Sequence, residues 1–425
     1  MEQVRGVEPP YSAWEADILP MNYTCIAPII ALQEKKSNPL FYFFFRQFLF
    51  PQEKCCCEKV SLEYLTKGGI MIDIGNSHPK IKIHRKKRVN TMKKTLAMLL
   101  AVVMVLSIML LAGCKDDTTT SAELDMALVV AGNFGDRSFY DSSKEGAERL
   151  EKEFGVKVTY IECNNDSHTT QMQNAADKAD VVVLVGWEFY EVNVIAPQYP
   201  NVKFIWIDNA TSEPVANLLN ITYAQNEGSF LAGYLAAAVS ESGVVGAVGG
   251  EDSDTINDFI VGYEQGAKYY GTEKGKNIEV VKNYTNSYDD PTLGKNCAIA
   301  LNEQGADVVF QIASAAGDGV FEAAREKGFY AIGVDSDQKY IADDVIICSM
   351  KKEVGDSIFE AVKQFLNGDD SLLGTTWIAD MGAGYVGIGY GEEGSTQQIP
   401  DEVKAEAAAL AEKIAKGEIT VDTTR

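Results

Sequence analysis

Histidine is scarce in this sequence, which has three histidines among 425 residues. Only His168 lies downstream of Cys114, so that part of the chain cannot supply a multi-histidine metal site and is poorly equipped for a histidine-based triad or proton relay. A dense cluster of aspartates, which could ligate a cation or serve a hydrolase, is also missing from the pattern. We therefore expect a binding protein without catalytic residues, metal or other cofactor.

The eight cysteines lack the spacing of a disulfide framework or of a metal site. Three of them lie far apart downstream of Cys114, each within an apolar strand-like or helical run: Cys163, Cys297 and Cys348. Small, buried, apolar residues are the expected role for these three.

A surplus of basic residues is also absent. The chain has 38 Lys and Arg against 61 Asp and Glu, for a net charge of −23, and the segment up to Cys114 is itself net basic, so the acidic surplus lies after it. Binding to nucleic acid depends on positive charge that neutralises phosphates, so nucleic acid is not expected as a partner.

The apolar run 96–112 has 17 residues, fewer than the ~20 that a membrane-spanning helix needs. It follows the basic start Met92-Lys93-Lys94 and ends at Leu111-Ala112-Gly113-Cys114, so residues 92–113 are typical of a cleaved signal peptide rather than of an uncleaved anchor. Leu-Ala-Gly-Cys resembles a bacterial lipobox. The resemblance implies an acylated Cys114 that holds the mature protein to the lipid bilayer, on the extracytoplasmic face of the cell membrane.

Residues 1–91 precede this signal and have the composition of a non-native extension. They include a Phe-Tyr-Phe-Phe-Phe run at 41–45, three consecutive cysteines at 55–57 and a basic run at 80–88, without sustained periodicity. An upstream misassignment of the start codon would explain them. We expect residues 114–123 to form a polar linker after the lipidated cysteine.

Short β-branched runs alternate with helical stretches from residue 124 on, which predicts an α/β protein with parallel sheets. The expected strands are 126–131, 157–161, 181–186, 203–208, 244–249, 278–284, 308–313 and 330–335. The expected helices are 140–153, 169–178, 228–240, 258–270, 291–303 and 319–327.

The pattern divides into two similar halves, so we predict two doubly wound lobes joined by a hinge. The N-terminal lobe would comprise 124–223 plus 347–381, including a helix over 354–367, and the C-terminal lobe 224–346 plus 382–395. The chain would cross between them at 217–226 and return at 337–349. A C-terminal helix is expected over 400–417 because Ala, Glu and Lys are abundant there.

Ligands of open parallel sheets bind beyond the carboxyl ends of the strands. The segments that follow the expected strands are rich in carboxylates, aromatics and glycines: 132–139, 186–190, 208, 250–259, 315–319 and 335–338. Two lobes facing each other would bring these segments into one cleft, where aromatic faces can sandwich a flat ligand and carboxylates can accept its N–H and O–H donors. Such a cleft suits a nucleoside.

Several motifs, in order along residues 124–390, resemble the basic membrane protein family, the PnrA-like nucleoside-binding lipoproteins. They are GDRSF at 135–139, EGSFLAGY at 227–234, GYEQGA at 262–267, YTNSYDDP at 284–291 and GVDSDQ at 333–338. The resemblance implies a type I periplasmic-binding-protein fold and a purine nucleoside as ligand. It also implies an ABC permease in the membrane as partner, with no chemistry on the ligand.

The resemblance assigns roles to five positions. Phe139 and Phe259 match aromatics that stack on the base from opposite lobes, and Asp136 matches a carboxylate that binds its polar edge. Asp335 matches an acceptor for the ribose diol, and Lys352 matches a lysine near the ribose.

Three further residues are secondary candidates: Trp187, Asp208 and Gly317. Gly317 lies in a Gly-Asp-Gly turn that is expected to border the cleft but lacks the Lys-Ser/Thr pair of a phosphate-binding loop. Lys351 remains an alternative to its neighbour Lys352. Tyr140 departs from the family, which often has asparagine there.

Structural roles compete with these assignments. Phe139 and Phe259 could pack into the core from the first turn of a helix, and Asp136 and Asp258 could cap helices. At the level of function, the alternatives are the same fold with a sugar or another small polar metabolite, a nucleoside-processing enzyme, and a transcriptional regulator. The signal peptide and the acidic charge disfavour the regulator.

Overall fold

The computed structural model describes residues 124–163 and 168–424. The predicted extension 1–91, signal peptide 92–113, lipidation site Cys114 and linker 114–123 lie outside these residues. Within the described ranges, no helix combines the length and the apolar character that crossing a membrane requires.

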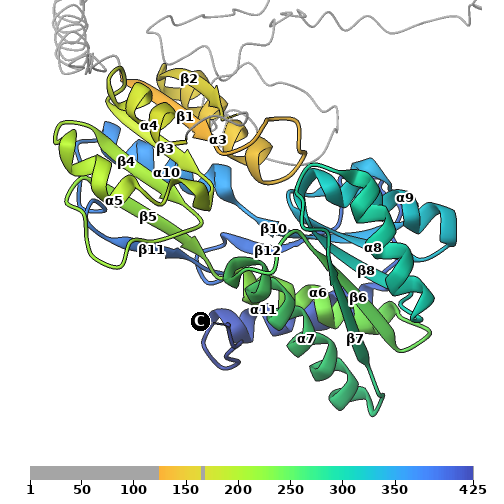
Figure 1. Cartoon of the computed structure of the whole chain (residues 1–425). Helices are drawn as coiled ribbons and strands as arrows, with labels where there is room; N and C mark the ends of the chain where they lie inside the picture. Colours follow the sequence, from red (N-terminus) through yellow and green to blue (C-terminus); the bar gives the residue numbers. More distant parts are fainter. Residues whose placement is uncertain (1–123, 164–167, 425) are drawn as a thin grey trace, which may run out of the picture. The chain divides into compact units, whose positions relative to one another are not determined.

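The first lobe contains a six-stranded sheet with the order β11-β5-β4-β3-β1-β2, in which all neighbouring strands run parallel (Figure 1). Helices α3 (Phe139–Phe154) and α10 (Val354–Leu366) pack on one face of it, and α4 (His168–Ala176) and α5 (Val192–Ile195) pack on the other. The strands are β1 (Asp125–Val130), β2 (Lys157–Glu162), β3 (Val181–Val185), β4 (Lys203–Ile207), β5 (Leu218–Tyr223) and β11 (Thr376–Ala379).

The second lobe repeats this plan with the order β12-β10-β9-β8-β6-β7, and only the β10–β12 pair is antiparallel. Helices α6 (Gln225–Val239) and α7 (Asp254–Lys274) cover one face, and α8 (Pro291–Glu303) and α9 (Asp318–Lys327) cover the other. The strands are β6 (Val244–Gly249), β7 (Glu279–Tyr284), β8 (Val308–Ile312), β9 (Tyr330–Asp335), β10 (Ile346–Lys352) and β12 (Val386–Gly389). The predicted fold of two doubly wound lobes is confirmed.

Local sequence explains many of these elements. All five residues of β3 are buried valines or leucine, as expected for a strand covered on both faces. Helix α8 begins with Pro291 after Asp290, whose carboxylate accepts a hydrogen bond from the Thr292 backbone N–H at 2.8 Å. Helix α9 ends at Gly328, which adopts the left-handed conformation (φ 78°) that closes helices.

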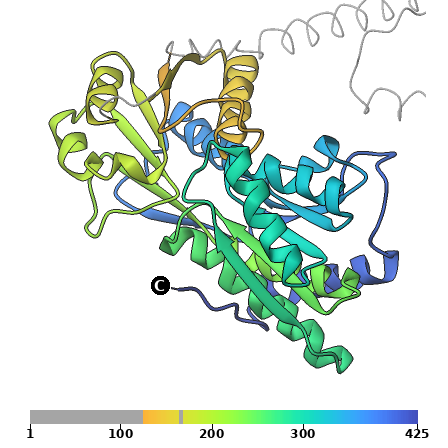
Figure 2. The ribbon, with the colours of Figure 1, turned by 45° about the vertical axis from the view of Figure 1, so that its right-hand side comes forward.

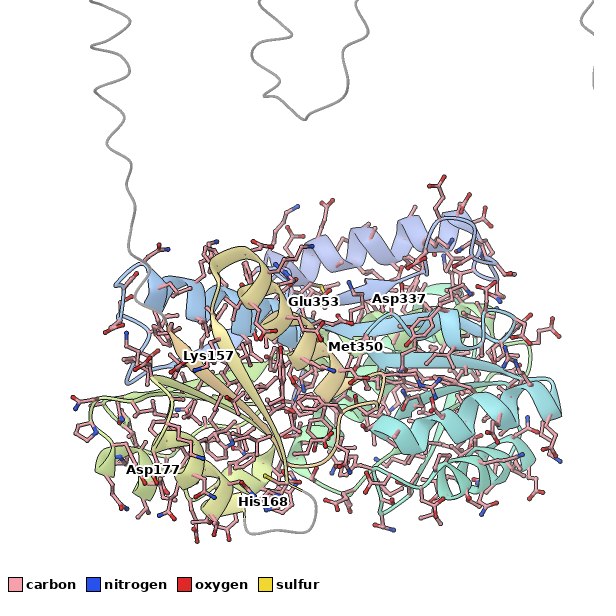
Figure 3. All side chains as sticks on the ribbon, turned by 90° about the horizontal axis from the view of Figure 1, so that it is seen from above. Lys157, His168, Asp177, Asp337, Met350 and Glu353 are labelled. Carbon is pink, nitrogen blue, oxygen red and sulfur yellow. The ribbon has the colours of Figure 1, made fainter. Side chains whose placement is uncertain are left out.

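The chain passes between the lobes three times within residues 168–424: from β5 to α6, from β10 to α10 and from β11 to β12. Figure 3 labels Met350 in β10 and Glu353 just before α10, on the second of these connections. One predicted lobe boundary was wrong: residues 347–352, expected to have returned to the first lobe, belong to β10 of the second. The first lobe does extend to residue 223 as predicted, but residues 218–223, which the predicted crossing also included, form β5 of the first sheet. Pairing with β4 and β9 provides these segments with backbone partners that a sequence pattern does not reveal.

The C-terminal segment returns to the second lobe. Helix α11 (Asp401–Ala415) packs on α6 and lies within its predicted range. The tail beyond it runs to the end marked C in Figure 2. It is held at two points: the Asn226 amide donates to the Val421 carbonyl at 2.8 Å, and the Thr424 backbone N–H donates to Asp258 Oδ1 at 2.9 Å. Helix α7 begins four residues before the predicted start, so Asp258 does not cap it and instead fixes the tail.

Helices α6 and α7 approach each other closely at three glycines. A Cβ atom on Gly233 would lie 2.0 Å from the Tyr263 carbonyl oxygen, one on Gly262 2.1 Å from that of Asn226, and one on Gly266 1.8 Å from that of Phe230. These distances are well inside van der Waals contact with backbone atoms that cannot move independently. The absence of side chains at these positions sets the spacing of the two helices, and α7 carries Phe259.

We predict that Gly266→Ala lowers the free energy of unfolding by about 1–3 kcal/mol or more, because the added methyl group forces α6 and α7 apart. Urea unfolding followed by circular dichroism would measure the change. Gly387→Ala is the matched control, since a Cβ atom there meets nothing within 4 Å. Equal losses in the two variants would contradict the assigned role of the glycines.

Candidate ligand-binding cleft

A cavity of about 600 Å³ lies between the two lobes, at the carboxyl ends of their strands. The first lobe lines it with Phe139, Tyr140, Gly186, Trp187, Glu188, Asp208 and Asn209. The second lobe lines it with Glu251, Ser253, Asp254, Thr255, Ile256, Phe259, Tyr288, Ile312, Ser314, Val334, Asp335 and Lys352. The size is that of a small-molecule pocket, and the position is the one at which open parallel sheets bind ligands.

Lys352 joins the two lobes within this cavity. It ends β10 in the second sheet, and its buried ammonium lies 2.7 Å from Oδ2 of Asp208, which follows β4 in the first sheet. The ammonium also lies 5.1 Å from the ring centroid of Phe139, 5.2 Å from that of Phe259 and 4.9 Å from that of Tyr223. These are cation–π distances, so one charge organises aromatic rings from both lobes.

The neighbouring Lys351 points elsewhere. Its ammonium pairs with Glu353, and it does not line the cavity. Of the two lysines that the sequence left as alternatives, Lys352 is therefore the one in the cleft.

Asp335 ends β9 and faces the first lobe. The Ser138 hydroxyl donates a hydrogen bond to its Oδ2 across the cleft, and the carboxylate is buried. Burial raises the pKa of Asp335 to about 6, against the opposing effects of the Lys352 ammonium and the Ser138 hydrogen bond. The carboxylate is thus poorly solvated and retains acceptor capacity toward the cavity.

Three residues that line the cavity adopt the left-handed backbone conformation without being glycine: Asp208 (φ 71°), Ser314 (φ 52°) and Asp335 (φ 61°). Asp208 directly follows β4, Ser314 comes two residues after the end of β8, and Asp335 ends β9. This conformation is unfavourable for residues with a side chain, and such strain gathers at functional sites where the surrounding fold enforces it. The three positions support a functional role for this end of the sheets.

Asp136 does not line the cavity. Its buried carboxylate accepts hydrogen bonds from the backbone N–H groups of Ser138, Tyr140 and Asp141 at 3.0–3.1 Å, and from the Ser314 hydroxyl at 2.9 Å. It therefore orders the start of α3 and links that loop to the second lobe, which is the capping role weighed against ligand binding. Burial raises the pKa of Asp136, and these hydrogen bonds oppose the shift.

The loop before α3 makes further contacts across the cleft. The Arg137 guanidinium forms an ion pair with Asp318, and the Arg137 carbonyl accepts a hydrogen bond from Nε2 of Gln338 at 3.0 Å. Asp136 and Ser138 of the same loop contact Ser314 and Asp335. These contacts hold the two lobes together beside the cavity.

Most of the other predicted residues line the cavity, and one lies outside its lining. Phe139, Phe259, Trp187, Asp208, Asp335 and Lys352 meet in one cavity, although Trp187 remains 52% exposed. Gly317 lies outside the lining in a 3-10 turn (Ser314–Gly317), where a Cβ atom would lie 1.9 Å from Gln311 Oε1. Close packing against Gln311, rather than contact with the cavity, accounts for this glycine.

Several lining residues were not predicted from the sequence, and four of them carry carboxylate or phenol groups: Glu188, Glu251, Asp254 and Tyr288. Glu188 and Glu251 do follow β3 and β6, in segments expected to border the cleft, but their type alone did not separate them from solvent-exposed carboxylates. Tyr288 follows β7, and a family motif included it without assigning a role. Tyr140, the departure from the family pattern, lines the cavity beside Phe139.

A two-lobed α/β protein with parallel sheets and a closed inter-lobe cavity defines the class of solute-binding proteins with the type I periplasmic-binding-protein fold. Comparison with known proteins agrees. The model of the family described as "Bmp: ABC transporter substrate-binding protein PnrA-like" matches residues 124–425, so the chain belongs to this family. It is accordingly a substrate-binding protein of an ABC transporter and not an enzyme.

Relatives and solved structures point the same way. Basic membrane protein A of Borreliella afzelii is 33% identical over 302 residues, which cover 70% of this chain and 90% of that protein. An uncharacterized lipoprotein of Pyrococcus abyssi is 31% identical over 332 residues, with coverage of 73% and 80%. The crystal structure of ABC transporter system solute-binding proteins from Aeropyrum pernix K1 is similar with a TM-score of 0.65 and 27% identity, covering 71% of this chain and 94% of that one.

Asp335→Asn tests the electrostatics of the cleft. Because the pKa of Asp335 is raised from 3.8 to about 6, the folded protein holds this proton more tightly than the unfolded chain does. The wild-type carboxylate therefore lowers stability increasingly as pH rises from about 4 to 6, by up to about 3 kcal/mol. We therefore expect the free energy of unfolding of Asp335→Asn, relative to that of wild type, to increase as the pH rises from about 4 to 6. Urea unfolding without ligand would measure it.

Asp344→Asn is the control for this experiment. Asp344 is exposed and paired with Arg325, which lowers its pKa, so its removal should give no such gain between pH 4 and 6. If the difference in free energy of unfolding between Asp335→Asn and wild type did not change over this range, the raised pKa would be contradicted.

Proposed function

We propose that this protein is a lipid-anchored receptor on the extracytoplasmic face of the cell membrane that binds a purine nucleoside between its lobes and delivers it to an ABC permease. The observation that supports it most directly is the placement of Phe139 and Phe259. The two rings come from opposite lobes, line one cavity, and each lie about 5 Å from the same Lys352 ammonium. A flat heterocycle can stack between two such rings.

The groups beside the rings match the sugar of a nucleoside. The Asp335 carboxylate can accept hydrogen bonds from a pair of vicinal hydroxyls, and the Lys352 ammonium can donate to a hydroxyl or ring oxygen. Lys352 keeps its charge balanced by Asp208, so the ligand need not supply a negative charge. This arrangement favours a neutral polyol portion attached to the stacked ring.

The charge of the lining favours nucleosides over nucleotides. It contains five carboxylates, Glu188, Asp208, Glu251, Asp254 and Asp335, and Lys352 is its one lysine or arginine. A phosphate would have to approach these carboxylates in a poorly hydrated cavity, where like charges repel strongly.

Anchoring through Cys114 completes the proposal. The motif at 111–114 and the preceding apolar run support it, as does the description of the Pyrococcus abyssi relative as a lipoprotein. Delivery to a permease follows from membership of a family of ABC transporter substrate-binding proteins. Acyl chains would keep the receptor near that permease.

We expect purine nucleosides to raise the melting temperature of the protein, since a ligand that binds only the folded state stabilises it. The measurement is a thermal-shift screen, followed by calorimetry, against nucleosides, free bases, nucleotides and sugars. Phe139→Ala should weaken nucleoside binding by about 1–3 kcal/mol through lost stacking. Phe154→Ala, at the other end of α3, is the matched control and should leave the affinity unchanged.

Stabilisation by sugars alone would be consistent with this fold but would contradict a nucleoside as the ligand. Absence of any response to nucleosides at protein concentrations suited to calorimetry would reject the nucleoside receptor altogether.

Cys114→Ala should abolish acylation of the protein in its native host. Metabolic labelling with a clickable fatty acid, followed by membrane fractionation, would measure both label and location. Cys163→Ala is the control, because that thiol is buried in the described structure and should not affect labelling. Unchanged labelling of Cys114→Ala would refute this lipidation site.

A further inference from the structure

Glu188 lines the cavity, and one of its carboxylate oxygens is buried over the neighbouring turn without a partner. Among the described residues, its Oε2 is shielded from solvent and has no hydrogen-bond donor. The residue lines the cavity from the 3-10 turn Trp187–Phe189 that follows β3. Leaving a buried acceptor unpaired is unfavourable by an amount comparable to a lost hydrogen bond, so this position requires an explanation.

The loop is built to hold this carboxylate in place. Gly186 has φ 131°, a conformation that L side chains rarely adopt, and a Cβ atom there would lie 2.5 Å from Glu188 Oε2. The carboxylate therefore folds over the bare Cα of Gly186. The Trp206 indole N–H donates to the Gly186 carbonyl at 2.8 Å and fixes the turn from the core side. The position of the orphaned oxygen is thus determined by the fold.

The surroundings of Glu188 are acidic and phenolic. Glu251 lies on the opposing lobe. Burial raises the pKa of Glu188 and the nearby Glu251 adds to this effect, whereas a hydrogen bond from the Glu188 backbone N–H and the nearby His168 oppose it. Tyr140 and Tyr288 line the same part of the cavity, and the charge of Glu188 contributes to the raised pKa of each. Closure of the lobes gathers two carboxylates here with no lysine or arginine between them, so this part of the cavity favours a ligand edge that is rich in N–H donors.

This part of the cavity lies away from the proposed ribose site. In the second sheet, Lys352 and Asp335 end β10 and β9, whereas Glu251 and Tyr288 follow β6 and β7 at the other side. A nucleoside whose ribose contacts Asp335, with its base between Phe139 and Phe259, would direct the free edge of the base toward this group.

We propose that Glu188 is a specificity-determining residue that reads this edge of the base and selects guanosine. The inference rests on the proposed nucleoside function. The carboxylate accepts hydrogen bonds from N1–H and the exocyclic N2–H of guanine, as carboxylates do from paired donors.

The other bases match an ionised carboxylate less well. Hypoxanthine retains N1–H but lacks the 2-amino group, so inosine offers one donor where guanosine offers two. Adenine presents its N1 lone pair, which an ionised carboxylate repels, beside one amino donor. The expected order of affinity at neutral pH is therefore guanosine, then inosine, then adenosine.

Calorimetry of the full chain in mild detergent, with guanosine, inosine, adenosine and 1-methylguanosine, tests this order. Wild type should bind guanosine at least about tenfold more tightly than adenosine, and the methyl group of 1-methylguanosine should remove that advantage. Glu188→Gln should reduce the guanosine affinity by at least about tenfold and change the adenosine affinity much less. Its unliganded melting temperature should stay level or rise, because a poorly solvated charge is lost.

Glu191→Gln is the matched control, three residues along the chain. Its carboxylate accepts a hydrogen bond from the Thr169 hydroxyl at 2.6 Å and does not line the cavity, so the nucleoside order should persist. A guanosine-to-adenosine ratio that is the same in wild type and Glu188→Gln, with both nucleosides bound, would overturn the role of Glu188 alone. Absence of binding of any nucleoside to wild type would instead overturn the proposed function on which it rests.

Discussion

The buried ammonium of Lys352 is the group on which the arrangement of the cleft depends. A charge removed from water is strongly unfavourable unless a counter-charge compensates it, and here that counter-charge, Asp208, belongs to the other lobe. The rings of Phe139, Tyr223 and Phe259 surround the same ammonium. One ion pair thus couples three things: the approach of the lobes, the position of the aromatic faces and the ionisation of Asp335, which the nearby positive charge favours.

The cleft is strained and electrostatically unbalanced where it faces the cavity, while the layers behind it are well packed. Asp208, Ser314 and Asp335 hold unfavourable backbone conformations at or just beyond the ends of strands that are largely buried between helices. Glu188 retains an unpaired oxygen over a glycine. Tightly packed sheets can sustain such locally unfavourable conformations, because packing fixes the position of the strand that precedes each residue. Binding proteins commonly concentrate unsatisfied groups where the ligand will satisfy them.

The sequence predicted the fold to a large extent because its signals are local. Continuous apolar runs such as 181–185 specify buried parallel strands, and all eight predicted strands are present. The strands that were missed, β5, β10, β11 and β12, lie toward one side of each sheet, where β11 and β12 are four-residue edge strands without a continuous apolar run. Pairing with distant segments, rather than local pattern, makes them strands.

Several residues that the motifs singled out lie together in the structure. Phe139, Phe259, Asp335 and Lys352 fall at strand or helix ends that face the cleft, and they meet there. Asp136 has the same local signature as a ligand-binding carboxylate, yet its neighbours' N–H groups occupy its oxygens. Glu188 could not be distinguished from any other loop glutamate, because its distinctive property, a buried oxygen without a donor above Gly186, exists only in the folded turn.

The three passages of the chain between the lobes bear on how the protein acquires its structure. The first sheet is completed by β11, at residues 376–379, which must pair with β5 more than 150 residues earlier in the chain. The second sheet is likewise completed only by β12, at residues 386–389. Neither lobe can therefore finish folding as an independent unit while the chain is still emerging, and closing such long loops is slow. The two lobes consequently complete their sheets together, after residues 376–389 have joined them.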